Sequence, residues 1–179
     1  MSKEGELDFT KPVPPPSAER VVEARKEATT VGPQLAKSGF YVAMARHAAG
    51  RVEPRAGERH SVLIVEDDEA LSNLVTEVLA TAGFLTRTAR NRTEINAEIN
   101  RALPDIVLLD VSLPDADGFQ ILERIRANAK IAKLPVIMMT GKSEVTDVAR
   151  GLALSADGYV TKPFKISALV TAVNTVLGL

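Results

Sequence analysis

The sequence contains no cysteine and no tryptophan, and only two histidines. Without cysteine, the chain forms no disulfide, uses no catalytic thiol and holds no thiolate-bound zinc or iron–sulfur cluster. Two histidines also argue against a histidine-rich metal site. Aromatic residues are 4% of the 179, so the core has to be aliphatic. Because a chain without cysteine suits a reducing compartment, we expect a cytoplasmic protein.

The sequence also lacks a long hydrophobic run and a strong net charge. The longest uncharged stretch that we find, Ile166–Leu179, has 14 residues, and a membrane-spanning helix needs about 20. The charged segment Met1–Thr10 does not resemble a secretory signal. The formal net charge is −1, which argues against bulk nucleic-acid binding. We therefore expect no membrane span and no direct contact with nucleic acid.

The composition changes near Arg59–His60. Residues 1–59 carry ten basic and eight acidic side chains, whereas residues 60–179 carry twelve basic and fifteen acidic ones. We therefore predict an N-terminal extension, residues 1–59, followed by a main domain, residues 60–179.

The extension has too little apolar surface to fold alone. Consecutive prolines end at Pro16 and favour an extended backbone, so residues 1–16 are interpreted as a flexible arm. A helix capped by Ser17, a stop at Gly32-Pro33, a second helix and a linker complete the prediction: Ala18–Thr29, Gln34–Ala49 and Gly50–Arg59. Two interpretations stay open: a mostly disordered tail, or a docking segment for a partner or for the main domain.

The main domain alternates short apolar runs with amphipathic segments. The apolar runs predict five strands: Ser61–Val65, Phe84–Ala89, Asp105–Leu109, Pro135–Met139 and Gly158–Thr161. Five helices are predicted after them. The first has Asp68 as candidate N-cap, apolar positions from Leu71 to Leu79 and its end at Gly83; the others are Arg92–Arg101, Phe119–Ala127, Glu144–Leu154 and Ile166–Leu177. The second strand is less apolar, as an edge strand would be. This alternation predicts an α/β fold, with a doubly wound parallel sheet covered on both faces.

Polar side chains follow four of these strands at the point where each strand ends. They are Glu66, Asp67 and Asp68 after the first strand, Asp110 after the third, Thr140 and Gly141 after the fourth, and Lys162 and Pro163 after the fifth. Because the carboxyl ends of parallel strands meet at one edge, where such folds bind their ligands, we expect these residues to converge.

Clustered carboxylates repel one another unless a cation neutralises them. With no thiolate or histidine nearby, the hard oxygen ligands indicate Mg²⁺, or alternatively Mn²⁺. The ammonium of Lys162, the hydroxyl of Thr140 and the unobstructed amide of Gly141 suit the oxygens of a phosphoryl group. One carboxylate can then act as nucleophile and form an aspartyl phosphate. Asp110 is the candidate, because it lies between the strands that carry the acidic pair and the hydroxyl.

Each of these residues also has an ordinary structural explanation. An acidic residue after a strand often caps a helix, and Asp68 taken alone fits a cap better than a ligand. A single Lys-Pro is usually part of a loop, and a single threonine is usually a turn residue. The coincidence at four strand ends is what favours a functional site.

Four segments of the main domain resemble the receiver domain of two-component response regulators. They are Val65–Asp68, Leu108–Pro114 followed by Asp117-Gly118-Phe119, Met138–Lys142, and Gly158–Phe164. They occur in the order and spacing of that family over residues 61–179. The resemblance implies a flavodoxin-like fold with strand order 2-1-3-4-5. One departure is Ser155, where glycine would be expected.

The resemblance implies a role for each matched residue. Asp110 would accept the phosphoryl group, and the Mg²⁺ ligands would be Asp67, Asp110, Glu66 through water, and the backbone carbonyl of Ser112. Thr140 and Lys162 would bind the phosphoryl oxygens, Tyr159 would be the aromatic switch partner of Thr140, and Lys162–Pro163 would be a cis peptide. Lys142 and Ser112 would flank the phosphoryl group.

The function implied is that of a single-domain response regulator that takes its phosphoryl group from a histidine kinase or a phosphotransfer protein. It would catalyse only its own phosphorylation and dephosphorylation, and it would signal by protein–protein contact, with homodimer formation left open. The extension could then be a tether, an inhibitor of the switch face or a localisation signal. Two alternatives remain. One is a phosphorylation-independent interaction module. The other is a Mg²⁺-dependent aspartyl-phosphate phosphohydrolase, although Glu66-Asp67-Asp68 lacks the D-x-D pattern of such enzymes.

Overall fold

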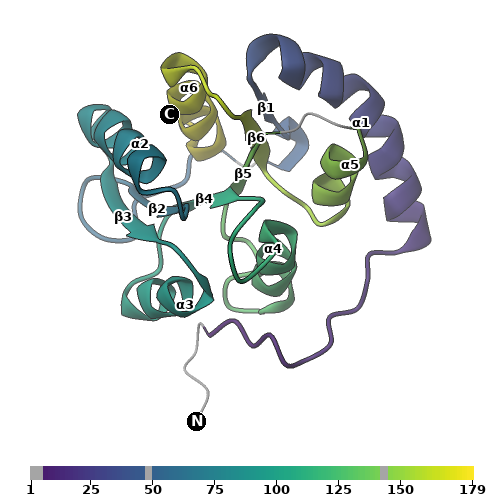
Figure 1. Cartoon of the computed structure of the whole chain (residues 1–179), viewed down its shortest axis with the longest axis horizontal. Helices are drawn as coiled ribbons and strands as arrows, with labels where there is room; N and C mark the ends of the chain where they lie inside the picture. The colour runs from purple at the N-terminus through teal and green to yellow at the C-terminus, as the bar shows by residue number, and fades with distance from the viewer. Residues whose placement is uncertain (1–5, 47–49, 142–144) are drawn as a thin grey trace.

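The computed structural model describes residues 6–46, 50–141 and 145–179. Its centre is a six-stranded sheet in the order β1-β6-β5-β4-β2-β3, with helices on both faces (Figure 1). The strands are β1 (Phe40–Val42), β2 (Ser61–Val65), β3 (Leu85–Ala89), β4 (Ile106–Asp110), β5 (Val136–Thr140) and β6 (Gly158–Thr161). The five strands β2 to β6 are parallel, and their order confirms the doubly wound flavodoxin-like prediction.

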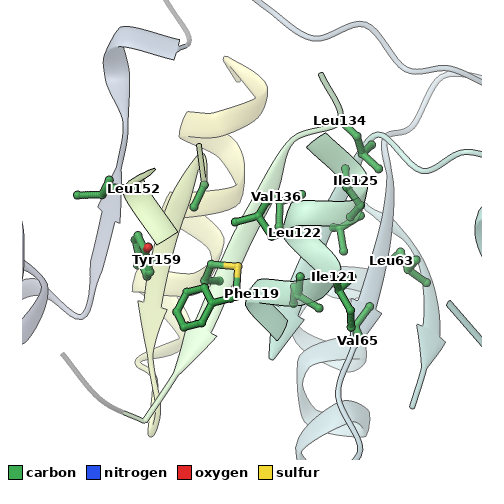
Figure 2. Packing of buried hydrophobic residues seen from close by; sticks show 14 of the residues in the cluster. Leu63, Val65, Phe119, Ile121, Leu122, Ile125, Leu134, Val136, Leu152 and Tyr159 are labelled. Carbon is green, nitrogen blue, oxygen red and sulfur yellow. The ribbon is translucent and has the colours of Figure 1, made fainter. Parts of the chain in front are cut away.

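The helices form two layers that bury opposite faces of the sheet. Their bounds are α1 (Ala18–Ser38), α2 (Glu69–Thr81), α3 (Arg92–Arg101), α4 (Gly118–Ala127), α5 (Val145–Ala153) and α6 (Ile166–Leu177). One hydrophobic cluster joins α2 and α6 to the sheet, and a second cluster joins α1, α3, α4 and α5 to the other face. Side chains of a strand alternate between the two faces of the sheet, and both faces are buried here. The central strands are therefore apolar at nearly every position, as the sequence predicts. Figure 2 shows part of the second cluster.

Three helices of the main domain, α2, α3 and α4, begin at side-chain caps. The Asp68 carboxylate accepts a hydrogen bond from the backbone N–H of Leu71 at 2.9 Å, so the capping explanation for this residue is confirmed. Asp117 caps α4 in the same way, through the N–H of Phe119. The predicted start of the fourth helix, Glu144, lies outside the described residues.

The extension folds differently from its prediction. Ser17 is the N-cap of α1, as expected, but Gly32-Pro33 does not end the helix, which continues to Ser38 with Pro33 inside it. Four buried apolar residues form its inner face: Ala24, Ala28, Val31 and Leu35. Their burial outweighs the backbone hydrogen bond lost at Pro33, which is exposed and accessible to water. The helix ends at Gly39, which has the left-handed φ of 80°.

The prediction of a second helix over Gln34–Ala49 is also wrong. The chain instead forms β1, which pairs antiparallel with β6, and then a short 3₁₀ helix, Met44–Arg46. Residues 47–49 lie outside the described part. A strand of three residues depends on its partner for stability, so the sequence of β1 alone gives little sign of it.

The arm is not free of the domain over residues 6–16. The Leu7 side chain is buried, and its backbone N–H donates to the Asn96 side chain of α3 at 2.9 Å. The guanidinium groups of Arg92 and Arg124 lie over the Phe9 ring, at 4.9 and 5.7 Å from its centroid. The prediction of a flexible arm is therefore wrong for these residues, and the alternative of a segment docked on the main domain describes them.

None of the helices in the described ranges is long and apolar enough to span a membrane.

Candidate functional site

Three carboxylates meet at the carboxyl ends of β2 and β4. Glu66, Asp67 and Asp110 each offer an oxygen that lies within 4.8 Å of the other two. Strands β2 and β4 are neighbours in the sheet, with Val65 paired to Leu109, so the residues that follow are brought side by side. The convergence predicted from the strand ends is therefore confirmed for these three residues.

The three carboxylates differ in burial. Glu66 and Asp110 are 1% and 5% exposed, whereas Asp67 is exposed to solvent. The Glu66 carboxylate accepts a hydrogen bond from the N–H of Asp68 at 3.1 Å. The Asp110 carboxylate accepts one from the N–H of Ser112, also at 3.1 Å. Two of the three charges are thus held in place inside the protein, and the third faces water.

Lys162 supplies the positive charge of the site. Its ammonium nitrogen lies 3.1 Å from Oδ1 of Asp110 and also donates to Oε2 of Glu66. Burial alone would lower the pKa of Lys162, but the hydrogen bond to Glu66 and the charge of Asp110 outweigh it and raise the pKa. Burial raises the pKa of Glu66, the nearby charge of Asp110 adds to this rise, and the hydrogen bond from Lys162 opposes it.

Thr140 ends β5 and Gly141 follows it, on the other side of Asp110 from β2. Thr140 is buried, and its backbone carbonyl accepts a hydrogen bond from the N–H of Lys162 at 2.7 Å. Gly141 is exposed, and a Cβ added there would meet nothing within 4 Å. The binding of a phosphoryl oxygen by the Gly141 amide stays a prediction. Lys142 lies outside the described residues.

Tyr159 lies beneath α5, away from the carboxylates. It is 1% exposed, and its hydroxyl donates to the backbone carbonyl of Val148 at 3.1 Å. The hydroxyl fills the space above Gly151, where a Cβ would lie 1.6 Å from it. Figure 2 shows Tyr159 with Leu152 and Phe119 in the same cluster. Its role as switch partner of Thr140 stays a prediction.

Two further expectations concern the backbone. Lys162–Pro163 is a cis peptide, as the resemblance implies. Ser155, which stands where glycine was expected, has a φ of 63°, the left-handed conformation that glycine tolerates best. The proposed metal contact of the Ser112 carbonyl stays a prediction.

Sequence reasoning gave no role to two glycines that shape the site. A Cβ on Gly118 would lie 2.2 Å from the Asp110 carbonyl oxygen, so only glycine lets the loop after β4 close against the phosphoacceptor strand. Gly151 makes room for Tyr159 in the way described above. Both depend on contacts between segments, and the spacing of apolar residues does not report such contacts.

The donor set fits a hard divalent cation. Glu66, Asp67 and Asp110 supply only carboxylate oxygens, and the exposed Asp67 leaves one side open to water, as Mg²⁺ requires. When bound, the ion would neutralise the carboxylates and the charge of a transferring phosphoryl group. The Lys162 ammonium contacts Glu66 and Asp110 of the same group and can hold a phosphoryl oxygen.

A model of the response regulator receiver domain matches residues 62–174 of the chain. The chain therefore belongs to the response regulator receiver family of two-component signalling. The fold and the acidic edge of the sheet described above are those of this family.

Similar proteins are found both by sequence and by structure. Regulatory protein VanRc of Enterococcus gallinarum is 41% identical over 116 residues, which cover 65% of this chain and 49% of that protein. The phosphate regulon regulatory protein PhoB of Rhizobium meliloti is 37% identical, with 65% and 51% covered. This chain thus matches about half the length of these relatives.

Among solved structures, a putative response regulator from Chloroflexus aurantiacus matches with a TM-score of 0.64 at 32% identity, covering 68% of this chain and 99% of that one. The chemotaxis protein CheY4 of Vibrio cholerae matches with a TM-score of 0.63 at 28% identity, covering 66% and 99%.

Proposed function

We propose that this receiver accepts a phosphoryl group on Asp110 from a histidine kinase or a phosphotransfer protein, with Mg²⁺ at Glu66, Asp67 and Asp110. The observation that carries the proposal is the arrangement around Asp110. A buried carboxylate faces a lysine ammonium at 3.1 Å and lies among two further carboxylates at one sheet edge. Such a set can hold the attacking oxygen and the charge of the group that it attacks.

In the proposed transfer, a carboxylate oxygen of Asp110 forms a bond to phosphorus. The bond from phosphorus to the donor's histidine nitrogen breaks, and its electron pair stays on that nitrogen. Lys162 and Thr140 would each hold a phosphoryl oxygen, so that Lys162 exchanges part of its contact with Asp110 for the new group. The chain acts on no external substrate in this account, and it catalyses only its own phosphorylation and dephosphorylation.

We infer that this receiver acts in the cytoplasm and that its output is protein–protein contact. The low net charge supports this for the 179 residues considered. Several relatives are described as DNA-binding, such as the response regulator MtrA of Mycobacterium leprae. The matched residues are about half of that protein, and we propose no nucleic-acid contact for the part that corresponds to this chain.

Phosphorylation by acetyl phosphate tests the proposal. Intact mass spectrometry of the full chain with acetyl phosphate and Mg²⁺ should show the addition of one phosphoryl group, and chelation of the metal should prevent it. Asp110→Asn should remain unlabelled. Asp115→Asn is the matched control, because Asp115 is an exposed carboxylate of the same loop, bound to Arg92.

Two results would contradict the proposal. Labelling of Asp110→Asn at the wild-type rate would place the phosphoacceptor elsewhere. A wild-type chain that takes no label under these conditions would favour an interaction module that works without phosphorylation.

A further inference from the structure

The extension packs directly on α5 and β6, the elements that surround Tyr159. Helix α1 lies along α5, and this is the most extensive contact between any two elements of the described structure (Figure 1). Ala28 and Leu35 of α1 are fully buried and belong to the same hydrophobic cluster as Tyr159. The guanidinium of Arg20 donates to the backbone carbonyl of Leu152, near the end of α5, at 2.7 Å. A movement of α5 or Tyr159 would therefore change the contacts that α1 makes.

A second contact joins the extension to the strand that carries the site lysine. Strand β1 pairs with the outer edge of β6, with Tyr41 opposite Tyr159. The carbonyl of Gly39 accepts hydrogen bonds from the N–H and the hydroxyl of Thr161, at 3.0 and 3.3 Å. Thr161 immediately precedes Lys162, whose ammonium lies 3.1 Å from Asp110. Only one residue thus separates the extension from the group that contacts the phosphoacceptor.

A third contact fixes the loop between α5 and β6. The Arg46 guanidinium lies 2.9 Å from Oδ1 of Asp157, which precedes β6. The N–H of Ala43 donates to the Asp157 carbonyl at 2.8 Å. The extension therefore holds β6 at its beginning, along its edge and at its end.

From these contacts we propose that residues 17–46 are a built-in positioning element for the phosphoryl site, and that their docking and phosphorylation of Asp110 favour each other. The proposal rests on the proposed function of Asp110. Without β1, strand β6 would be the edge of the sheet, held on one side only. Docking of the extension pairs both edges of β6, which fixes the backbone from which Lys162 reaches Asp110.

Docking also encloses Tyr159 between the sheet, α5 and α1. A phosphoryl group on Asp110 would contact Lys162 and Thr140, so its binding requires β5 and β6 in their correct positions. The docked extension already holds β6 in that position before the group binds. By thermodynamic reciprocity, such a group must then strengthen docking by the same factor. The extension would be an activating part of the receiver, in contrast to an inhibitor of its switch face.

The chain carries its own probes for this test. It has two tyrosines, Tyr41 in the extension and Tyr159 in the domain, and they lie opposite each other at the junction. Incorporation of fluorotyrosine gives two ¹⁹F resonances on the full chain, which Tyr41→Phe assigns. Beryllofluoride, a mimic of the phosphoryl group, is then added with Mg²⁺. When it is bound to the protein, it gives ¹⁹F signals of its own. One spectrum therefore reports both the site and the extension.

The expected result is that the Tyr41 resonance shifts with the same beryllofluoride dependence as the bound beryllofluoride signal. Leu35→Ala should loosen the docked helix and weaken beryllofluoride binding by at least about fivefold, the lower end of typical coupling between sites. Val22→Ala is the matched control, because Val22 lies on the exposed side of the same helix and should leave binding unchanged. Arg20→Gln is the second variant, for use if Leu35→Ala does not fold. It removes the α1–α5 hydrogen bond without creating a cavity in the core, and it should also weaken beryllofluoride binding.

The outcomes separate the two proposals. Absence of a bound beryllofluoride signal would overturn the function proposed for Asp110. A bound signal with an unmoved Tyr41 resonance would overturn only the coupling. Tighter beryllofluoride binding in the folded docking variants would also overturn it, because the extension would then oppose phosphorylation.

Discussion

Gly151 has no side chain, and the Tyr159 hydroxyl occupies the space that a side chain there would take. A methyl group there would stand 1.6 Å from the Tyr159 hydroxyl and 3.1 Å from the Phe119 ring. Tyr159 is buried, so its ring has no free space into which it can retreat. The Tyr159 ring is therefore positioned by a glycine of α5 that belongs to no recognised motif.

Gly151→Ala should destabilise the protein by about 1–3 kcal/mol through overpacking, although alanine is the better helix former by about 1 kcal/mol. Urea unfolding monitored by circular dichroism measures this change. In a Tyr159→Phe background, which removes the hydroxyl, the same substitution should cost less. A Gly151→Ala protein as stable as the wild type would contradict the packing described for Tyr159.

Glu66 should make metal binding depend on pH. Burial raises the pKa of Glu66 in the folded protein above its ordinary 4.5. Without metal, this carboxyl therefore loses its proton at a lower pH in the unfolded chain than in the folded one. The free energy of unfolding consequently falls as the pH rises through the range between these two pKa values. Mg²⁺ requires the ionised carboxylate, so its stabilising effect should instead grow as pH rises. The Mg²⁺-induced rise in Tm should therefore be larger at neutral pH than at about pH 5.

Glu66→Gln removes the titrating group and should reduce this pH dependence. Asp115→Asn serves as the control and should leave it in place. A stabilisation by Mg²⁺ that is equal at both pH values in the wild type would show that Glu66 does not contribute to the cation site.

At the scale of elements, the central sheet and its helices were predictable because their patterns are strong. Short, β-branched apolar runs such as Val62–Val65 favour a buried strand over a helix, and α6 matches its predicted bounds, Ile166–Leu177. The meeting of Glu66, Asp67 and Asp110 follows from that topology alone. What the sequence does not show is the distance from Lys162 to Asp110, or which of the acidic residues is only a cap.

The extension was mispredicted for a physical reason. The buried face of α1 uses Ala24 and Ala28, small residues that occur equally well on a surface, so its pattern does not reveal that it packs against anything. Pro33 and Gly32 resemble a helix end, and only the packing of Val31 and Leu35 on the domain carries the helix through them. Strand β1 likewise depends on β6, which lies more than a hundred residues away in the sequence.

Pro33 is thus a local defect that tertiary packing tolerates. Pro33→Ala restores a backbone donor within α1 at an exposed position and should stabilise the protein by roughly 1–3 kcal/mol, less than the full proline penalty because the unfolded chain also gains freedom. Thermal or urea unfolding measures it. Gln34→Ala, at the exposed neighbouring position, should change stability by less than about 0.5 kcal/mol. No gain in Pro33→Ala would mean that the path of α1 depends on its proline.

At the scale of the whole molecule, the extension and the receiver share one core. Leu7, Leu35 and Tyr159 lie in the same hydrophobic cluster, although the chain changes composition near Arg59–His60. The relatives and solved structures match the receiver part, and about a third of this chain lies outside that match. The extension therefore lies outside the part of this chain that matches those proteins.

Asp110 is the proposed phosphoacceptor, and one chemical measurement locates the phosphoryl group directly. The full chain is phosphorylated with acetyl phosphate and Mg²⁺, then treated with borohydride, which reduces an aspartyl phosphate to homoserine, and its peptides are sequenced by mass spectrometry. We predict homoserine in place of aspartate at position 110 and unmodified aspartate at positions 67, 68, 115 and 117. Homoserine at another of these positions, or at none in a chain that carries the phosphoryl mass, would contradict the account.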